Sequence, residues 1–261
     1  ECCAKSKEDD MIKRNLIKRL MAAGAIMAVT LSLTGCGIGG NSVKLGAAGV
    51  GGGYYAFSNA FAQIASSEDE DLDFEVKATA GSTANIRLLS DGYVDMAIAQ
   101  ADLVDAAYNG TGATDKKRYR GYSAVASLYT EACQIVVRSD SGIDSLDDLQ
   151  GKKISVGEEE SGTQRNAEQI LKMTGLVESL VDTVNLDYVD AANELKSGQI
   201  DAFFCTAGIQ TSVIEELSKE CDVKLIGIDD KCRDRLKSVY GFYTDYTIPA
   251  GTYEGQTQDV V

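Results

Sequence analysis

The residues best suited to chemistry lie in five short turns rich in glycine and hydroxyl side chains. The turns are residues 51–55, 79–85, 100–102, 161–163 and 206–208. Each opens an expected helix, whose first backbone N–H groups are unpaired at the positive end of the helix dipole. Such ends bind phosphate, carboxylate or sulfate without a cation. The alternative is that each Ser, Thr or Asp only caps its own helix. Capping alone explains any single turn more readily than it explains all five turns together.

Other chemistries are excluded by what the sequence lacks. The chain has no histidine, which rules out Ser-His-Asp and Cys-His nucleophiles, HExxH zinc sites and histidine proton shuttles. The glycine run 49–53 misses the dinucleotide fingerprint because Tyr54 stands where the third glycine is required, and no GxxxxGK[ST] sequence occurs. No CxxC spacing suggests a metal. We therefore expect a binding protein without cofactor or metal.

The N-terminal part has the features of a targeting segment. From Met11, four basic residues precede an uncharged apolar run over 21–33, which is too short to span a bilayer of about 30 Å. The run ends in Leu33-Thr34-Gly35-Cys36, which resembles a lipobox. We expect an upstream extension over 1–10, a lipoprotein signal peptide over 11–35 and lipidation of Cys36. The alternative is an ordinary secretory signal followed by a chance cysteine.

The charge balance argues against a nucleic-acid partner. The formal net charge is −15, and residues 1–35 carry six Lys or Arg and four Asp or Glu, so residues 36–261 have a net charge of −17. Binding to a phosphate backbone depends on clustered Lys and Arg. An acidic body is also repelled by an anionic membrane surface.

Four cysteines follow Cys36. Cys133 and Cys205 stand in apolar, strand-like runs and are expected to be buried thiols. Cys221 and Cys232 flank one expected strand and turn, and they are the candidate disulfide pair in an exported protein. The sequence leaves that pairing open.

Strands and helices alternate along the rest of the chain. Strands are expected at 43–47, 74–78, 96–99, 123–137, 154–157, 184–188, 201–205 and 223–228, and helices at 54–66, 82–90, 102–109 (capped by Asp102), 163–174, 191–197 and 209–217, with a further helix start at 145–148. This alternation predicts an α/β fold with parallel sheets. A similar helix–glycine–strand unit occurs at 89–98 and 195–204, on either side of the long stretch 123–137. We therefore expect two lobes with a crossing strand and a ligand cleft between them, where strand ends meet helix starts.

Several ordered segments carry a family resemblance. They are residues 43–46 leading into 51–55, 81–89, 95–102, 108–112, 135–143, 156–163, 201–204 and 248–253. Together they resemble solute receptors of the TAXI family, the TRAP-associated extracytoplasmic immunogenic proteins. The resemblance covers nearly all of 43–261.

The resemblance implies a two-lobed, type II-like periplasmic-binding-protein fold that closes about a hinge. Residues 36–42 are then a tether, 43–130 lobe one, 131–250 lobe two, and 251–261 the start of a return connection. The implied solute is a small carboxylate, either a glutamate-like amino acid or a dicarboxylate, delivered to a TRAP permease of the fused type. The protein would be a monomer, held to the bilayer at the outer face of the cytoplasmic membrane through Cys36.

The expected ligand contacts come from both lobes. They are Gly53, Tyr54, Tyr55, Ser82, Thr83, Asn85, Gln100, Asp102, Ser161, Gly162, Thr163, Ala207 and Gly208. Residues 161–163 would hold a carboxylate, while Gln100 or Asp102 would fix the other end of the solute or an amine.

The chain departs from the family pattern at two places. Glu160 replaces a common glycine and completes Glu158-Glu159-Glu160, which either faces solvent or selects an ammonium group. The family also continues past Tyr253 into a returning strand and C-terminal helices, so the resemblance implies that the C-terminal part of the fold is missing here. Two other functions stay open: a sensor for a signalling partner, and an exported enzyme using Asp102 or the glutamates as general base.

Overall fold

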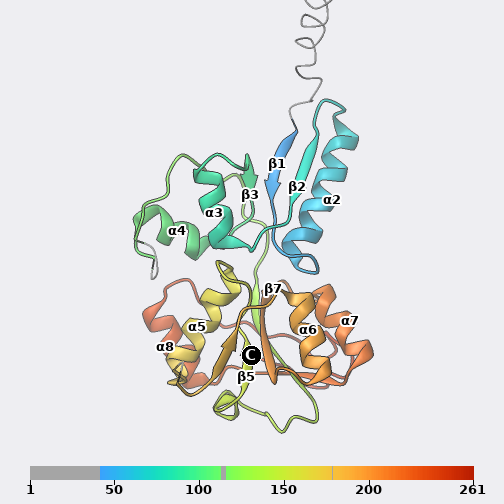
Figure 1. The fold of residues 1–261 in the computed structure, drawn as a ribbon, viewed down its shortest axis with the longest axis vertical. Helices are drawn as coiled ribbons and strands as arrows, with labels where there is room; N and C mark the ends of the chain where they lie inside the picture. The colour runs from blue at the N-terminus through green and yellow to red at the C-terminus, as the bar shows by residue number, and fades with distance from the viewer. Residues whose placement is uncertain (1–41, 113–115, 178) are drawn as a thin grey trace, which may run out of the picture. The chain divides into compact units, whose positions relative to one another are not determined.

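The computed structural model describes residues 42–112, 116–177 and 179–261. The expected signal peptide, Cys36 and all but the last residue of the tether lie outside the described residues. Two separate sheets, each flanked by helices, confirm the α/β class (Figure 1). Within the described ranges, no helix combines the length and the apolar character needed to cross a membrane.

Lobe one, residues 42–112, is built on a three-stranded parallel sheet in the order β2–β1–β3. The strands are β1 (Val43–Gly46), β2 (Phe74–Lys77) and β3 (Met96–Ala97), and the helices are α2 (Gly53–Glu68), α3 (Ser82–Ser90) and α4 (Ala101–Asn109). Helix α2 packs on β2, where the Phe61 and Phe74 rings meet edge to face at 5.2 Å. Asn85 of α3 joins the strand ends, because its Nδ2 donates to the carbonyls of Ala47 and Ile98 at 2.5 and 2.8 Å.

Lobe two, residues 132–261, is built on a five-stranded sheet in the order β6–β5–β7–β4–β8. Its strands are β4 (Ala132–Arg138), β5 (Lys153–Ser155), β6 (Asp182–Val184), β7 (Ala202–Ala207) and β8 (Val223–Ile226). The expectation of purely parallel sheets is wrong here, because β4 runs antiparallel to both β7 and β8. Ala132 pairs with Ala207, so the chain arriving from lobe one enters this sheet at the carboxyl end of β7.

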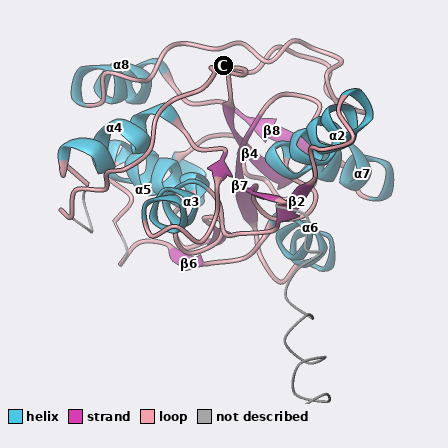
Figure 2. Ribbon diagram, turned by 90° about the horizontal axis from the view of Figure 1, so that it is seen from above, coloured by secondary structure: helices cyan, strands magenta, loops and turns pink. Residues whose placement is uncertain are grey.

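Two helix pairs cover the two faces of this sheet (Figures 1 and 2). One pair is α5 (Gly162–Thr174) and α8 (Asp230–Val239), and the other is α6 (Tyr188–Ser197) and α7 (Ser212–Glu220). Successive side chains of β7 point to opposite faces of the sheet, so the strand contributes to both hydrophobic clusters. Phe204 packs toward α5 and α8, and Phe203 packs toward α6 and α7, each with no exposed surface. Lobe two is thus a three-layer unit with two hydrophobic clusters.

The crossing segment, residues 116–131, is not a strand. The stretch 123–137 was expected to be one long strand, but pairing begins only at Ala132, because the residues before it lie between the sheets and pair with neither. Asp102 does not cap α4 either. Gln100 is the N-cap residue, and Asp102 lies within the first turn, where its carboxylate still faces the positive end of the dipole.

Two expectations in lobe two also need correction. The helix start at 145–148 gives only the 3₁₀ turn η1 (Asp147–Leu149), in which the Asp148 carboxylate accepts from the backbone N–H groups of Asp144 and Ser145 at 3.0 and 2.9 Å. Helix α8 was not expected at all. It begins at a side-chain cap, where the Cys232 N–H donates to Asp229 at 3.0 Å.

All four cysteines of the described chain are free thiols. Cys205 is buried and Cys133 is half-buried. The candidate pair Cys221 and Cys232 is not bonded, because Cys232 packs in the core beside Ile170, whereas Cys221 ends α7 with partial exposure.

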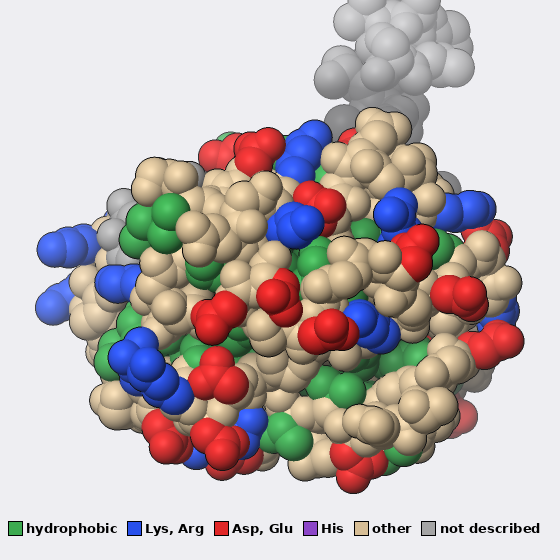
Figure 3. All heavy atoms as spheres, turned by 90° about the horizontal axis from the view of Figure 1, so that it is seen from below, with side chains coloured by type: hydrophobic (Ala, Val, Ile, Leu, Met, Phe, Trp, Pro, Cys, Tyr) green, Lys and Arg blue, Asp and Glu red, His purple; other side chains and the backbone are tan. Residues whose placement is uncertain are grey.

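The segment 248–261 returns along lobe two. Ile248 and Val260 form an antiparallel bridge, and the Ile228 N–H donates to the Val261 carbonyl at 2.8 Å. On the face seen in Figure 3, acidic and basic side chains are interspersed. The negative net charge is therefore not gathered into one patch on that face.

Candidate functional site

The two lobes contact each other directly at the start of α3. The carbonyl of Glu160 accepts hydrogen bonds from the N–H groups of Thr83 and Ala84 at 3.1 and 3.2 Å. Its carboxylate pairs with Arg87 at 2.6 Å, and both side chains are about 40% exposed. Glu160 has a φ of 64°, a conformation that favours glycine. The carbonyl of Glu160 therefore occupies the anion-binding end of α3 from the opposite lobe, while its carboxylate is partly exposed, pairs with Arg87 and lies in the lining of the cavity described below.

A second contact brings the start of α5 against Gln100. The Gln100 N–H donates to Ser82 Oγ at 3.1 Å, and its Nε2 donates to Asn166 Oδ1 at 2.9 Å across the lobes. Gly162 leaves the room for this approach, since a Cβ at that position would collide with Gln100 Oε1. A glycine is thus required at position 162 for the lobes to meet in this way.

A third contact joins the turn before α2 to lobe two. Ser212 Oγ donates to the Gly51 carbonyl at 3.1 Å, and the Tyr188 ring lies against Gly52. The lobes therefore contact each other on both sides of the crossing segment.

A cavity of about 950 Å³ remains between the lobes. Its walls are α3 and α4 of lobe one and β4, α5, α8 and the loop after α8 of lobe two. The polar side chains that line it near the crossing segment are those of Gln100, Asp102, Glu131, Arg165, Asn166 and Thr206. Burial raises the pKa of Asp102, and the nearby Arg165 guanidinium opposes that rise.

Glu131 ends the crossing segment at the floor of this cavity. Tyr54 OH donates to its Oε2 at 2.9 Å. Burial raises the pKa of Glu131 to about 7; the hydrogen bonds from Tyr54 and Gln100 lower it, and the charge of Asp102 adds to the rise. Glu131 was not among the expected site residues, although it is the one charged residue in the apolar stretch 123–137, which was the available signal.

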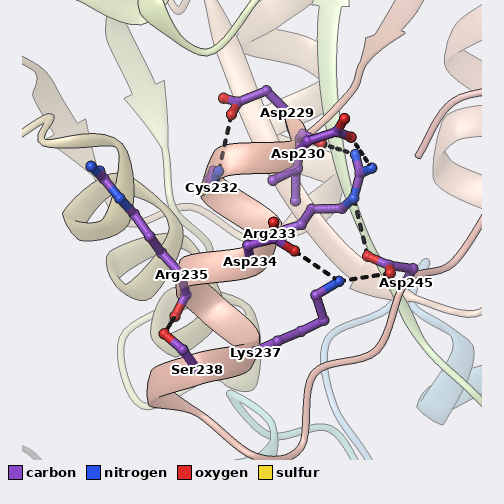
Figure 4. A network of polar contacts seen from close by, with 10 residues as sticks. Asp229, Asp230, Cys232, Arg233, Asp234, Arg235, Lys237, Ser238 and Asp245 are labelled. Carbon is purple, nitrogen blue, oxygen red and sulfur yellow. Dashed lines mark hydrogen bonds and ion pairs between the residues drawn. The ribbon is translucent and has the colours of Figure 1, made fainter.

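A network on α8 positions one further wall of the cavity. Arg233 and Lys237 both hold Asp245, at 3.1 and 2.8 Å, and so fix the loop after α8 (Figure 4). That loop presents Tyr243, whose OH accepts from Asn166 Nδ2 at 2.7 Å and donates to Gln169 Oε1 at 2.5 Å. The chain of contacts from Asp245 therefore ends at the Asn166 side chain that holds Gln100.

The expected ligand contacts divide into groups. Thr83, Gln100, Asp102 and Ser161 line the cavity. Tyr54 lies behind Glu131 as its hydrogen-bond donor. The other expected residues are not part of the lining: Gly53, Tyr55, Ser82, Asn85, Gly162, Thr163, Ala207 and Gly208.

Some of these other residues have partners of their own. Asn85 is fully buried and joins strand ends within lobe one. Thr163 Oγ1 is 2.5 Å from Tyr188 OH within lobe two. Their contacts with a solute stay predictions. Ser161 Oγ accepts from the Gln164 N–H at 2.9 Å, so it caps α5 as well as lining the cavity.

The described residues hold no group of three or more Cys, Asp or Glu arranged to bind a metal ion. Burial raises the pKa of Cys133 to about 12, so this thiol beside the cavity stays protonated. The cavity is lined by neutral and acidic oxygen atoms and by four basic side chains, a set of groups that suits reversible binding; the basic residues are Arg87, Arg165, Arg233 and Lys237.

Comparison with known proteins gives a family and a fold. The family described as NMT1-like matches residues 45–261. A protein from Bordetella bronchiseptica RB50 is 22% identical, with 77% of this chain and 60% of that chain covered and a TM-score of 0.55. An ancestral arginine-binding protein bound to glutamine is 18% identical, with 71% of this chain and 78% of that chain covered and a TM-score of 0.50. A putative L-cystine ABC transporter from Listeria monocytogenes is 16% identical, with 76% of this chain and 89% of that chain covered and a TM-score of 0.50. At these identities the likeness is one of fold, that of the two-lobed periplasmic binding proteins.

Proposed function

This chain belongs to the NMT1-like family, and from that premise we propose that it is an extracytoplasmic solute-binding protein. It captures a small solute by closing two lobes and delivers it to a membrane transporter. The observation that carries the proposal is the cavity between the lobes, which contains buried polar atoms without hydrogen-bond partners.

The interface between the lobes suits repeated opening and closing. The contacts described between the lobes are mostly hydrogen bonds, with one partly exposed ion pair and the Tyr188 ring against Gly52, whereas both hydrophobic clusters lie within lobe two. Polar interfaces of this kind separate at low cost, and an extended segment outside both sheets is a natural hinge. The crossing segment, residues 116–131, has that character.

The finer assignment rests on the sequence motifs. We propose a TAXI-type receptor of a TRAP permease, binding a small carboxylate and acting as a monomer without cofactor or catalytic activity. Cys36 would carry the lipid anchor at the outer face of the cytoplasmic membrane, where two acyl chains suffice for stable attachment. The domain limits at 130 and 250 belong to the same proposal.

A thermal-shift screen of the purified chain tests the proposal. The library contains amino acids, dicarboxylates, sulfonates and sugars, each at a concentration series. A true solute at 100 times its dissociation constant stabilises the fold by about 2.7 kcal/mol. Gln100→Ala should lose that shift, while the exposed control Lys219→Ala on α7 should keep it. Stabilisation by sugars alone would overturn the carboxylate class, and no stabilisation by any small solute would overturn the receptor function.

A further inference from the structure

Two residues that line the cavity have a buried side-chain oxygen atom without a hydrogen-bond partner. These atoms are Gln100 Oε1 and Thr206 Oγ1. The Glu131 carboxylate lies in the same lining with Asp102 as a second carboxylate. Gln100 Nε2 already donates to Asn166, so the amide presents its oxygen as the group still to be satisfied. Buried acceptors without donors cost free energy, which a donor-rich ligand would recover.

No protein cation neutralises Glu131 within the described residues. The side chains that change its pKa are those of Tyr54 of α2, Gln100 before α4 and Asp102 within α4, and all three are neutral or acidic. The negative charge of Glu131 also raises the pKa values of four groups on the crossing segment, β4, α6 and β7. These groups are neutral or acidic as well: Tyr129, Cys133, Tyr188 and Cys205.

The four cations that line the cavity have other partners. Arg233 and Lys237 both pair with Asp245. Arg87 pairs with Glu160 across the lobes. Arg165 lies 3.5 Å from Glu168 and acts on Asp102. A buried carboxylate without a counter-ion is unfavourable unless it stays neutral or a bound cation pairs with it.

We propose that Glu131 is the counter-ion for a primary ammonium group of the solute, with Gln100 Oε1 and Thr206 Oγ1 as the further acceptors of its N–H groups. Arg165 of α5 lines the same cavity, and it would exchange its partly exposed ion pair with Glu168 for the carboxylate of the same molecule. The solute class is therefore a zwitterionic amino acid in preference to a dicarboxylate or 2-oxo acid. This inference rests on the proposed receptor function and selects among its solutes.

The protonation of Glu131 gives the proposal a second readout. Burial raises the pKa of this carboxyl to about 7. An ammonium group beside it would lower that pKa, so binding would release protons at neutral and slightly acidic pH. A solute without an ammonium group would not release them.

Calorimetry with matched ligand pairs tests the proposal. Each pair is an amino acid and its 2-oxo acid, such as L-glutamate and 2-oxoglutarate, with pairs of three side-chain lengths. We expect the amino acid of at least one pair to bind about 100-fold more tightly, since a buried charge pair is lost in the oxo acid. Glu131→Gln should remove most of this preference without weakening the oxo acid, and the exposed α7 control Glu216→Gln should keep it.

The outcomes separate this inference from the proposed function. Equal affinities within every pair, or a full preference in Glu131→Gln, would overturn the ammonium site. Binding of oxo acids or dicarboxylates in that case would still support the receptor function, whereas binding of neither class would contradict both. Proton release, measured in two buffers of different ionisation enthalpy, tests the wild-type protein without relying on the folding of the variant.

Discussion

The two lobes are stabilised by different means. Lobe two has two hydrophobic clusters on either side of β7, with Phe203 and Phe204 fully buried. In lobe one, α4 has no buried residue and α2 buries only Tyr54 and Ser58. The most buried side chain at the ends of its strands is the polar Asn85. Few buried apolar contacts mark the parts of a protein that open at low free energy. We therefore expect lobe two to be the more stable unit and lobe one to open at a lower free energy.

The largest expected difference in stability between the lobes comes from removing one aromatic ring from each. Phe203→Ala should lower the free energy of unfolding by about 3–5 kcal/mol, because it leaves a cavity in a closed core. Phe61→Ala removes a half-buried ring on α2 and should cost less than about 2 kcal/mol. Urea denaturation of both variants measures the difference. Equal losses would mean that lobe one is as tightly packed as lobe two.

A second substitution examines the polar interior of lobe one. Asn85→Ala leaves the carbonyls of Ala47 and Ile98 without their donor, and should destabilise the protein by about 2–3 kcal/mol. Hydrogen exchange should accelerate in β1 and β3 and stay unchanged in β7. Acceleration in both lobes alike would contradict the view that they open separately.

A pH series probes the boundary between the lobes. The Glu131 pKa is about 7 in the fold and about 4.3 in the unfolded chain, so the folded state binds more protons between these values. Stability should therefore fall as pH rises from about 4.5 to 7, on the order of 2 kcal/mol, and then level off. Glu131→Gln should remove this slope, with the exposed Glu216→Gln as the control. A slope that survives in Glu131→Gln would have another origin.

The smallest expected effect concerns the ion pair that links the lobes. Glu160→Gly keeps the positive φ and removes the carboxylate from Arg87, which should change stability by about 0.2–1 kcal/mol. The population of open molecules should rise up to about fivefold, because 1 kcal/mol is worth that factor. Small-angle scattering of the empty protein measures the opening, with Glu159→Gln as the neighbouring control. An unchanged radius of gyration would show that the pair does not hold the lobes together.

Much of the fold could be predicted where local signals are strong. Helix α5 was expected within one residue, since Ser161 caps it and Gly175 ends it in a left-handed conformation. Helix α8 was missed because only Cys232 and Leu236 are buried, so its polar sequence shows little apolar periodicity. The direction of β4 depends on how the crossing segment enters the sheet, which no local pattern encodes.

The site was predictable in part for the same reason. Gln100 and Asp102 stand at a strand end and line the cavity, as the general rule for α/β sheets suggests. Glu131 was missed because it stands in an apolar stretch that was interpreted as a strand. Its importance comes from the absence of a nearby cation among the described residues, which is a property of the assembled lobes.

The carbonyl of Glu160 on the N-terminus of α3 has a consequence for the proposed solute binding. A solute would reach the cavity through those molecules in which this contact and its neighbours are open. Its measured dissociation constant would then be the intrinsic one divided by that open fraction. A substitution that weakens the contact between the lobes should therefore tighten the measured binding even though it touches no part of the solute.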